Sequence, residues 1–207
     1  MYIGSTGFDG LHHLLKEIAD NSIDEAIAGF ANKVKITILS DGGIRVDDNG
    51  RGIPVDIHPK TGKSALETVL TVLNAGGKFG GGGYKVSSGL HGVGSSVVNA
   101  LSDKMVAEVR KNGKTHHIEF ERGKTWAKGL EVADGVVEVE KGDASDVWST
   151  GTSITFYPDA TIFKETTTFD YNWVSNYARH QAYLTKGVLI SVFDERTGAR
   201  ESFYFEG

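Results

Sequence analysis

Two polar residues, Glu17 and Asn21, stand four positions apart in a stretch with helical periodicity. Their side chains should therefore project from one face of a helix, one turn apart. An amide oxygen at Asn21 can complete an octahedral Mg²⁺ shell made mostly of phosphate oxygens and water. A carboxylate at Glu17 can then polarise an attacking water molecule. The alternative is that this stripe, with Asp20, Asp24 and Glu25 beside it, is a solvated acidic face and nothing more.

A second candidate is the string Asp-Asn-Gly-Arg-Gly-Ile-Pro at residues 48–54, which follows an expected strand. The carboxylate of Asp48 can accept a hydrogen bond from the exocyclic amine of adenine. The two glycines of the string can form a flat floor under a base, and Ile53 and Pro54 can form an apolar edge. The alternative is a tight turn, because Asp-Asn-Gly is ordinary turn chemistry.

A third candidate is the string Gly-Leu-His-Gly-Val-Gly at residues 89–94, which leads into an expected helix. Glycines ahead of a helix N-terminus can cradle phosphate, because unpaired N–H groups and the positive end of the helix dipole meet there. Lys78 and Lys85, in the glycine-rich stretch before it, can reach phosphate oxygens as point charges. The alternative is a flexible surface loop.

These residues must be positioned by helices and strands. Apolar residues at three- and four-residue spacing predict helices over residues 8–28, 64–73, 94–101 and 169–184. Alternation and turn signals predict strands over residues 33–39, 44–47, 105–110, 115–121, 129–140, 152–157, 188–193 and 202–205, with a loop over 74–88. Helices and hairpins in separate runs predict an α+β fold, a two-layer sandwich in which helices cover one face of a mixed sheet.

Composition excludes several other classes of protein. The 207 residues include no cysteine, which rules out disulfides, thiolate metal sites and a cysteine nucleophile. The formal net charge of −5 and the lack of a basic stripe argue against direct DNA binding by this domain. There is no signal-peptide pattern and no apolar run of membrane-spanning length, so we expect a cytoplasmic protein that does not contact a membrane. A Walker A loop is excluded, because Ile57 stands where its first glycine is required.

Taken together, the motifs resemble a known superfamily. Glu17-x-x-x-Asn21, Asp48-x-Gly50-x-Gly52 and Gly89-x-x-Gly92-x-Gly94, closed by Gly151-Thr152, match in order the nucleotide-binding motifs of the GHKL (Bergerat-fold) ATPases. Longer words, such as Ala-Gly-Gly-Lys-Phe at 75–79 and Leu-His-Gly-Val-Gly at 90–94, are similar to the ATPase domains of bacterial type IIA topoisomerase B subunits. This family comprises the B subunit of DNA gyrase and the ParE subunit of topoisomerase IV.

The resemblance implies a role for each matched residue. Glu17 is implied to be the general base, and Asn21 the Mg²⁺ ligand. Asp48 is implied to read adenine with Thr152 sharing a bridging water, and Arg51 to lie over the base edge and pair with Glu25. Residues 76–94 are implied to form an ATP lid. The whole implied ATP-binding set is Asn21, Glu25, Asp48, Arg51, Gly52, Ile53, Pro54, Gly76, Gly77, Lys78, Lys85, Leu90, His91, Gly92, Val93, Gly94, Ser95 and Thr152.

The function implied is that of the ATP-binding and ATP-hydrolysing domain of a DNA gyrase B subunit, with Mg²⁺ as cofactor. Its partners would be a topoisomerase A subunit and DNA in the full enzyme, with aminocoumarins as ATP-competitive ligands. Residues 1–207 are expected to be one domain of a homodimeric subunit, without the family's N-terminal arm and transducer domain. The isolated chain would then be a monomer that binds ATP with weak turnover. The alternatives are ParE, which decatenates DNA, and a nucleotide-binding module that does not hydrolyse.

Overall fold

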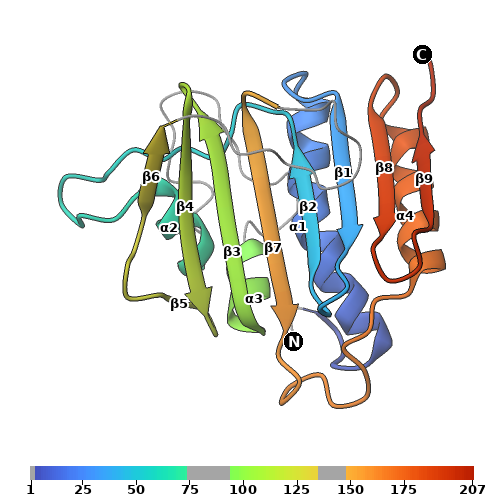
Figure 1. Cartoon of the computed structure of the whole chain (residues 1–207), viewed down its shortest axis with the longest axis horizontal. Helices are drawn as coiled ribbons and strands as arrows, with labels where there is room; N and C mark the ends of the chain where they lie inside the picture. Colours follow the sequence, from blue (N-terminus) through green and yellow to red (C-terminus); the bar gives the residue numbers. More distant parts are fainter. Residues whose placement is uncertain (1–2, 74–93, 135–147) are drawn as a thin grey trace.

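The computed structural model describes residues 3–73, 94–134 and 148–207. Its strands form one mixed sheet in the order β5-β4-β3-β7-β2-β1-β8-β9, with β6 pairing with β4 (Figure 1). The pair β1–β8 is parallel and the other strand pairs are antiparallel. The strands are β1 (Lys33–Ile38), β2 (Ile44–Asp48), β3 (Ser102–Lys111), β4 (Lys114–Glu121), β5 (Lys124–Thr125), β6 (Glu131–Asp134), β7 (Gly151–Pro158), β8 (Leu189–Asp194) and β9 (Arg200–Phe203).

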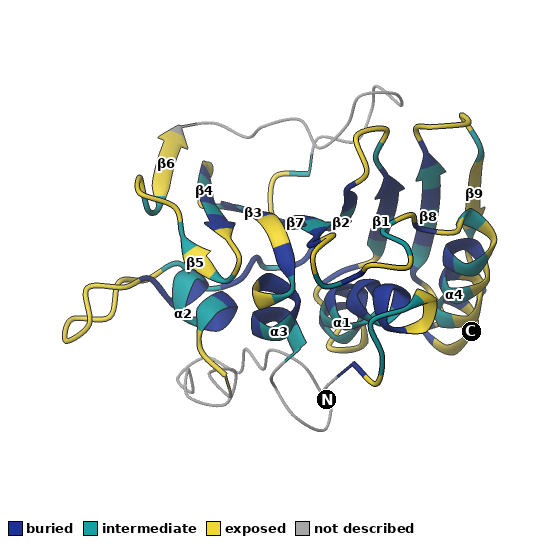
Figure 2. Cartoon of the chain, turned by 90° about the horizontal axis from the view of Figure 1, so that it is seen from below, coloured by how far each residue is buried: buried dark blue, intermediate teal, exposed yellow. Residues whose placement is uncertain are grey.

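The helices all lie on one face of this sheet, as Figure 2 shows. They are α1 (Phe8–Ile27), α2 (Ala65–Thr71), α3 (Gly94–Ala100) and α4 (Tyr171–Leu184). The predicted α+β sandwich is therefore confirmed. The short strand β5 has no counterpart among the predicted strands, and the predicted strand 129–140 is seen as β6 within the described residues. None of the helices in the described parts of the chain is both long and apolar enough to cross a membrane.

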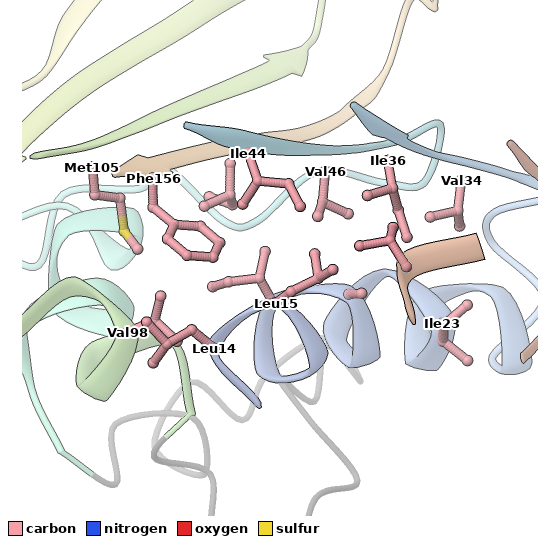
Figure 3. Packing of buried hydrophobic residues seen from close by; sticks show 14 of the residues in the cluster. Leu14, Leu15, Ile23, Val34, Ile36, Ile44, Val46, Val98, Met105 and Phe156 are labelled. Atoms are coloured by element: carbon pink, nitrogen blue, oxygen red, sulfur yellow. The ribbon is translucent and has the colours of Figure 1, made fainter. Parts of the chain in front are cut away.

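The core lies between the helix layer and the sheet, and Figure 3 shows the part of it around α1. Alternate residues of the central strands, among them Ile36, Ile44 and Val46, face the helix layer and are almost completely buried. In Figure 3, Leu15 of α1 lies toward Ile44 and Leu14 lies toward Val98 of α3. Each such side chain stabilises the fold by about 1.5–3 kcal/mol on burial. Burial of these leucines fixes the rotation of α1 about its axis, and this rotation determines where its polar residues point.

Candidate functional site

The predicted site residues that the structure describes lie where α1 faces the end of β2, the start of α3 and the start of β7. The structure describes these predicted residues: Glu17, Asn21, Glu25, Asp48, Arg51, Gly52, Ile53, Pro54, Gly94, Ser95 and Thr152. The other predicted residues lie outside the described residues: Gly76, Gly77, Lys78, Lys85, Leu90, His91, Gly92 and Val93. The predicted lid, residues 76–94, is therefore described only at Gly94.

Glu17 lies at the junction of α1 and α3. Its Oε1 is 2.9 Å from Nε2 of His13, one helical turn earlier, and its side chain is 34% exposed. A Cβ at Gly94 would lie 2.1 Å from Oε2 of Glu17, so any other residue at the start of α3 would make this carboxylate shift. His13 is absent from the predicted site residues, although its spacing of four from Glu17 is visible in the sequence.

Asn21 lies one turn further along α1 and also faces α3. Its amide nitrogen donates a hydrogen bond of 2.6 Å to Oγ of Ser95. This bond directs the nitrogen to Ser95 and leaves the amide oxygen as the end of Asn21 that can bind a cation. A single neutral oxygen suits Mg²⁺, which usually takes few protein ligands and keeps phosphate oxygens and water. Within the described residues, no group of three or more histidine or acidic side chains can hold a metal ion.

Asp48 is 5% exposed and ends β2 beneath α1. Its Oδ2 accepts a hydrogen bond from Oγ of Ser22 (2.8 Å), and its Oδ1 accepts from the backbone N–H groups of Gly50 (3.0 Å) and Thr152 (3.3 Å). Burial raises the pKa of Asp48 to about 6, and the nearby charge of Glu25 adds to this rise, while the three hydrogen bonds oppose it. Near neutral pH the carboxylate is therefore ionised, a strong acceptor held in a fixed orientation.

Glu25 does not lie on a solvated acidic face. It is 6% exposed and accepts hydrogen bonds from Arg51: the backbone N–H and Nε donate to Oε1 (2.9 and 2.8 Å), and Nη2 donates to Oε2 (2.9 Å). The guanidinium of Arg51 also lies 3.5 Å from the centre of the Phe30 ring. The solvated-face alternative is thus wrong for Glu25, because the loop after β2 folds back and covers it.

The loop after β2 is held against β7. Oγ1 of Thr152 accepts a hydrogen bond of 3.1 Å from the backbone N–H of Ile53. Gly52 has a φ of +78°, and a Cβ there would lie 2.8 Å from Val109. Both the backbone conformation and the contact therefore require glycine at this position.

The chemical groups follow an order along α1. Glu17, Asn21 and Glu25 occupy successive turns, and at 1.5 Å per residue the first and last are separated by roughly 12 Å along the axis. Ser22 lies between them and contacts Asp48. The site therefore has a carboxylate able to activate water at one end, an amide oxygen next to it, and a buried acceptor further along. This order matches the terminal phosphate, metal and base of an extended nucleotide.

Comparison with known proteins shows the family of this chain. Residues 7–162 match the family described as "Histidine kinase-, DNA gyrase B-, and HSP90-like ATPase". The chain belongs to this family.

Its relatives include the B subunit of DNA gyrase from Streptococcus pyogenes serotype M18, which is 54% identical over 209 residues covering 100% of this chain and 30% of the relative. The gyrase B subunit of Synechocystis sp. is 53% identical, with 18% of that protein covered. The chain is also similar to a solved structure, the crystal structure of the 43K ATPase domain of Thermus thermophilus gyrase B in complex with an aminocoumarin. The TM-score is 0.80 and the sequence identity 40%, and the match covers 100% of this chain and 49% of the Thermus thermophilus chain. The chain thus spans less than a third of the length of these gyrase subunits.

Proposed function

We propose that this chain is the ATP-binding and ATP-hydrolysing domain of a bacterial DNA gyrase B subunit, which drives DNA strand passage and negative supercoiling. Identity of 53–54% to gyrase B subunits along the whole chain supports gyrase over the alternative, the ParE subunit of topoisomerase IV. The observation that carries the proposal is the order of Glu17, Asn21 and Asp48 along the side of α1 that meets α3 and the end of β2. Residues 1–207 are proposed to act as one domain.

In the proposed reaction, the exocyclic amine of adenine donates to the carboxylate of Asp48, whose orientation Ser22 and Thr152 maintain. Glu17 accepts a proton from the water whose oxygen bonds to the terminal phosphorus; the bond from this phosphorus to the bridging oxygen breaks, and ADP and phosphate are released. His13 holds the carboxylate of Glu17 in place. Mg²⁺, when bound through Asn21, neutralises charge on the phosphates. Of the backbone amides proposed to hold these phosphates, those of Gly94 and Ser95 belong to the described residues.

The proposed partners follow from the same assignment. In a complete gyrase, the partners are a topoisomerase A subunit, DNA and a second B subunit, with DNA bound elsewhere than on this domain. The Thermus thermophilus domain was solved with an aminocoumarin, and we extend this class of ligand to the present chain. A cytoplasmic location and the lid role of residues 76–94 stay predictions.

The variant Glu17→Gln, made in the full-length subunit, tests the proposal. It keeps the shape of the side chain but removes the base, so ATP hydrolysis should fall by about 10²–10⁴-fold while binding of a non-hydrolysable ATP analogue is retained. Supercoiling with the A subunit should be lost in parallel. Glu121→Gln, at an exposed position on β4, is the matched control and should leave turnover unchanged. Normal turnover in Glu17→Gln would remove Glu17 as the general base.

A further inference from the structure

Arg110 of β3 is an unusual residue for the sheet, because its large charged side chain is only 1% exposed. Its Nη2 donates a hydrogen bond of 3.0 Å to the backbone carbonyl of Asp48, and its Nη1 donates one of 2.7 Å to Oγ of Ser153. Its Nε has no hydrogen-bond partner among the described residues. Burying a guanidinium with one unsatisfied N–H costs stability. Packing alone therefore does not explain an arginine at this position.

The contact with Asp48 lies where the ladder between β2 and β7 ends. The last paired residues of this ladder are Asp47 and Ser153, so Asp48 is one residue beyond it. The strands β3, β7 and β2 lie side by side (Figure 1). The guanidinium of Arg110 reaches from β3 past the start of β7 to its hydrogen bond with Asp48 on β2. It thereby supplies a donor to a carbonyl that lies beyond the last residue pair of this ladder.

Gly151 makes this reach possible. It pairs with Arg110 across the β3–β7 ladder and has a φ of +136°. A Cβ at this position would lie 1.9 Å from the carbonyl oxygen of Asp48 and 2.8 Å from Nη2 of Arg110. Any larger residue would therefore separate the two hydrogen-bonded groups. The next residue, Thr152, donates its N–H to the side chain of the same Asp48.

A network of hydrogen bonds, on the face of the sheet opposite the helices, holds the other end of the guanidinium. Ser153, which accepts from Arg110, donates a hydrogen bond to the buried carboxylate of Asp47. Asp47 in turn accepts from Nε of Arg45 at 2.9 and 3.1 Å. Arg45 thus joins this network through the side chains of Asp47 and, with a hydrogen bond of 3.5 Å from its Nη2, Ser153, whereas Arg110 also binds the main chain of Asp48. This difference makes Arg45 a matched comparison for Arg110.

We propose that Arg110 is a positioning residue for nucleotide recognition: by fixing the main chain of Asp48, it sets the place at which the carboxylate meets the amine of adenine. Ser22, Gly50 and Thr152 orient the side chain, while Arg110 fixes the backbone from which it extends. This inference rests on the proposed adenine-reading role of Asp48.

The experiment compares ADP with purine riboside 5′-diphosphate, which lacks the 6-amino group, by titration calorimetry on the purified chain. The wild-type chain should bind ADP about 10–100-fold more tightly than the analogue, the range of a hydrogen bond to a charged acceptor. Arg110→Gln should weaken ADP binding about tenfold and leave the analogue nearly unchanged, so that discrimination is largely lost. Arg45→Gln should keep the wild-type ratio.

Ser153→Ala provides a second variant, since it removes one anchor of the guanidinium and leaves Arg110 in place. It should lower the discrimination ratio in the same direction, by about two- to threefold. Equal weakening of both nucleotides in the Arg110 and Ser153 variants, or an unchanged ratio, would show a merely structural role and overturn the proposal. A wild-type chain that binds ADP and the analogue equally well would instead overturn the role of Asp48 itself.

Discussion

The substitution Asp48→Asn should stabilise the free chain near neutral pH while weakening its binding of adenine nucleotides. Burial raises the pKa of Asp48 from its ordinary value of 3.8 to about 6. Between these values the unfolded chain releases the proton while the folded chain retains it, so the free energy of unfolding falls as the pH rises. At about 1.4 kcal/mol per pH unit, the loss above pH 6 amounts to about 3 kcal/mol.

Asparagine keeps most of the local contacts. Its Oδ1 can accept from the N–H groups of Gly50 and Thr152, and its amide nitrogen can donate to Oγ of Ser22. The neutral amide removes the titration, but it presents a donor to the amine of adenine where the carboxylate presents an acceptor. We therefore expect affinity for ADP to fall by about 1.5–3 kcal/mol.

Urea unfolding of the nucleotide-free wild-type chain and of Asp48→Asn, from pH 4 to pH 8, measures this effect. The difference in unfolding free energy should change in favour of the variant by about 2.4 kcal/mol across this range, because the unfolded chain is already partly ionised at pH 4. The change with pH is the informative quantity, because altered hydrogen bonds add a constant offset. Two parallel stability profiles would refute the reasoning, since Asp48 would then have the same pKa in both states.

Three further variants test the surroundings of the site. Glu25→Ala removes the buried carboxylate that accepts from the partly exposed Arg51, and it should lower the free energy of unfolding by about 1–3 kcal/mol, measured by urea unfolding; a loss near zero would contradict a stabilising pair. Gly151→Ala should lower the free energy of unfolding by more than about 2 kcal/mol and impair ADP binding. The control is Gly198→Ala, since Gly198 has a φ of +76° and a Cβ there would meet no atom within 4 Å; this variant should lose less stability and keep its ADP binding. Equal effects of the two substitutions would contradict the close approach at Gly151. Burial lowers the pKa of His12, so the free energy of unfolding should fall as the pH drops below 6.5. His12→Gln, made in the Asp48→Asn background, should remove this dependence of stability on pH. If the dependence persists in the double variant, another group causes it.

Elements with a clear local pattern are predicted well by the sequence. The alternation in β1 and β2 places Ile36 and Val46 toward the core, as the structure shows. The Asn112-Gly113 pair predicts a hairpin between β3 and β4, and both residues have positive φ angles, as the two-residue turn requires. In these cases the residues that determine the structure are neighbours along the chain, so local reasoning suffices.

The site could be predicted only in part. Glu17 and Asn21 are four residues apart, so their common face follows from helix geometry. The burial of Glu25 depends on Arg51, 26 residues away, and the environment of Asp48 depends on Arg110 and Thr152, 62 and 104 residues away. Such contacts exist only after the sheet has assembled, and an arginine in a strand pattern gives no sign that it will be buried.

The described site combines stabilising contacts with features that cost stability. Asp48 is buried as a carboxylate with a raised pKa, and Arg110 is buried with one N–H that has no partner in the described part of the chain. The guanidinium of Arg110, a residue of β3, meets Asp48 at the end of β2, where Gly151 brings two strands closer than any other residue would allow. A sheet selected for stability alone would place apolar side chains at positions 48 and 110. Because both costs fall on the same strand end, they are most simply explained by one requirement, a charged acceptor held in a fixed position for a ligand.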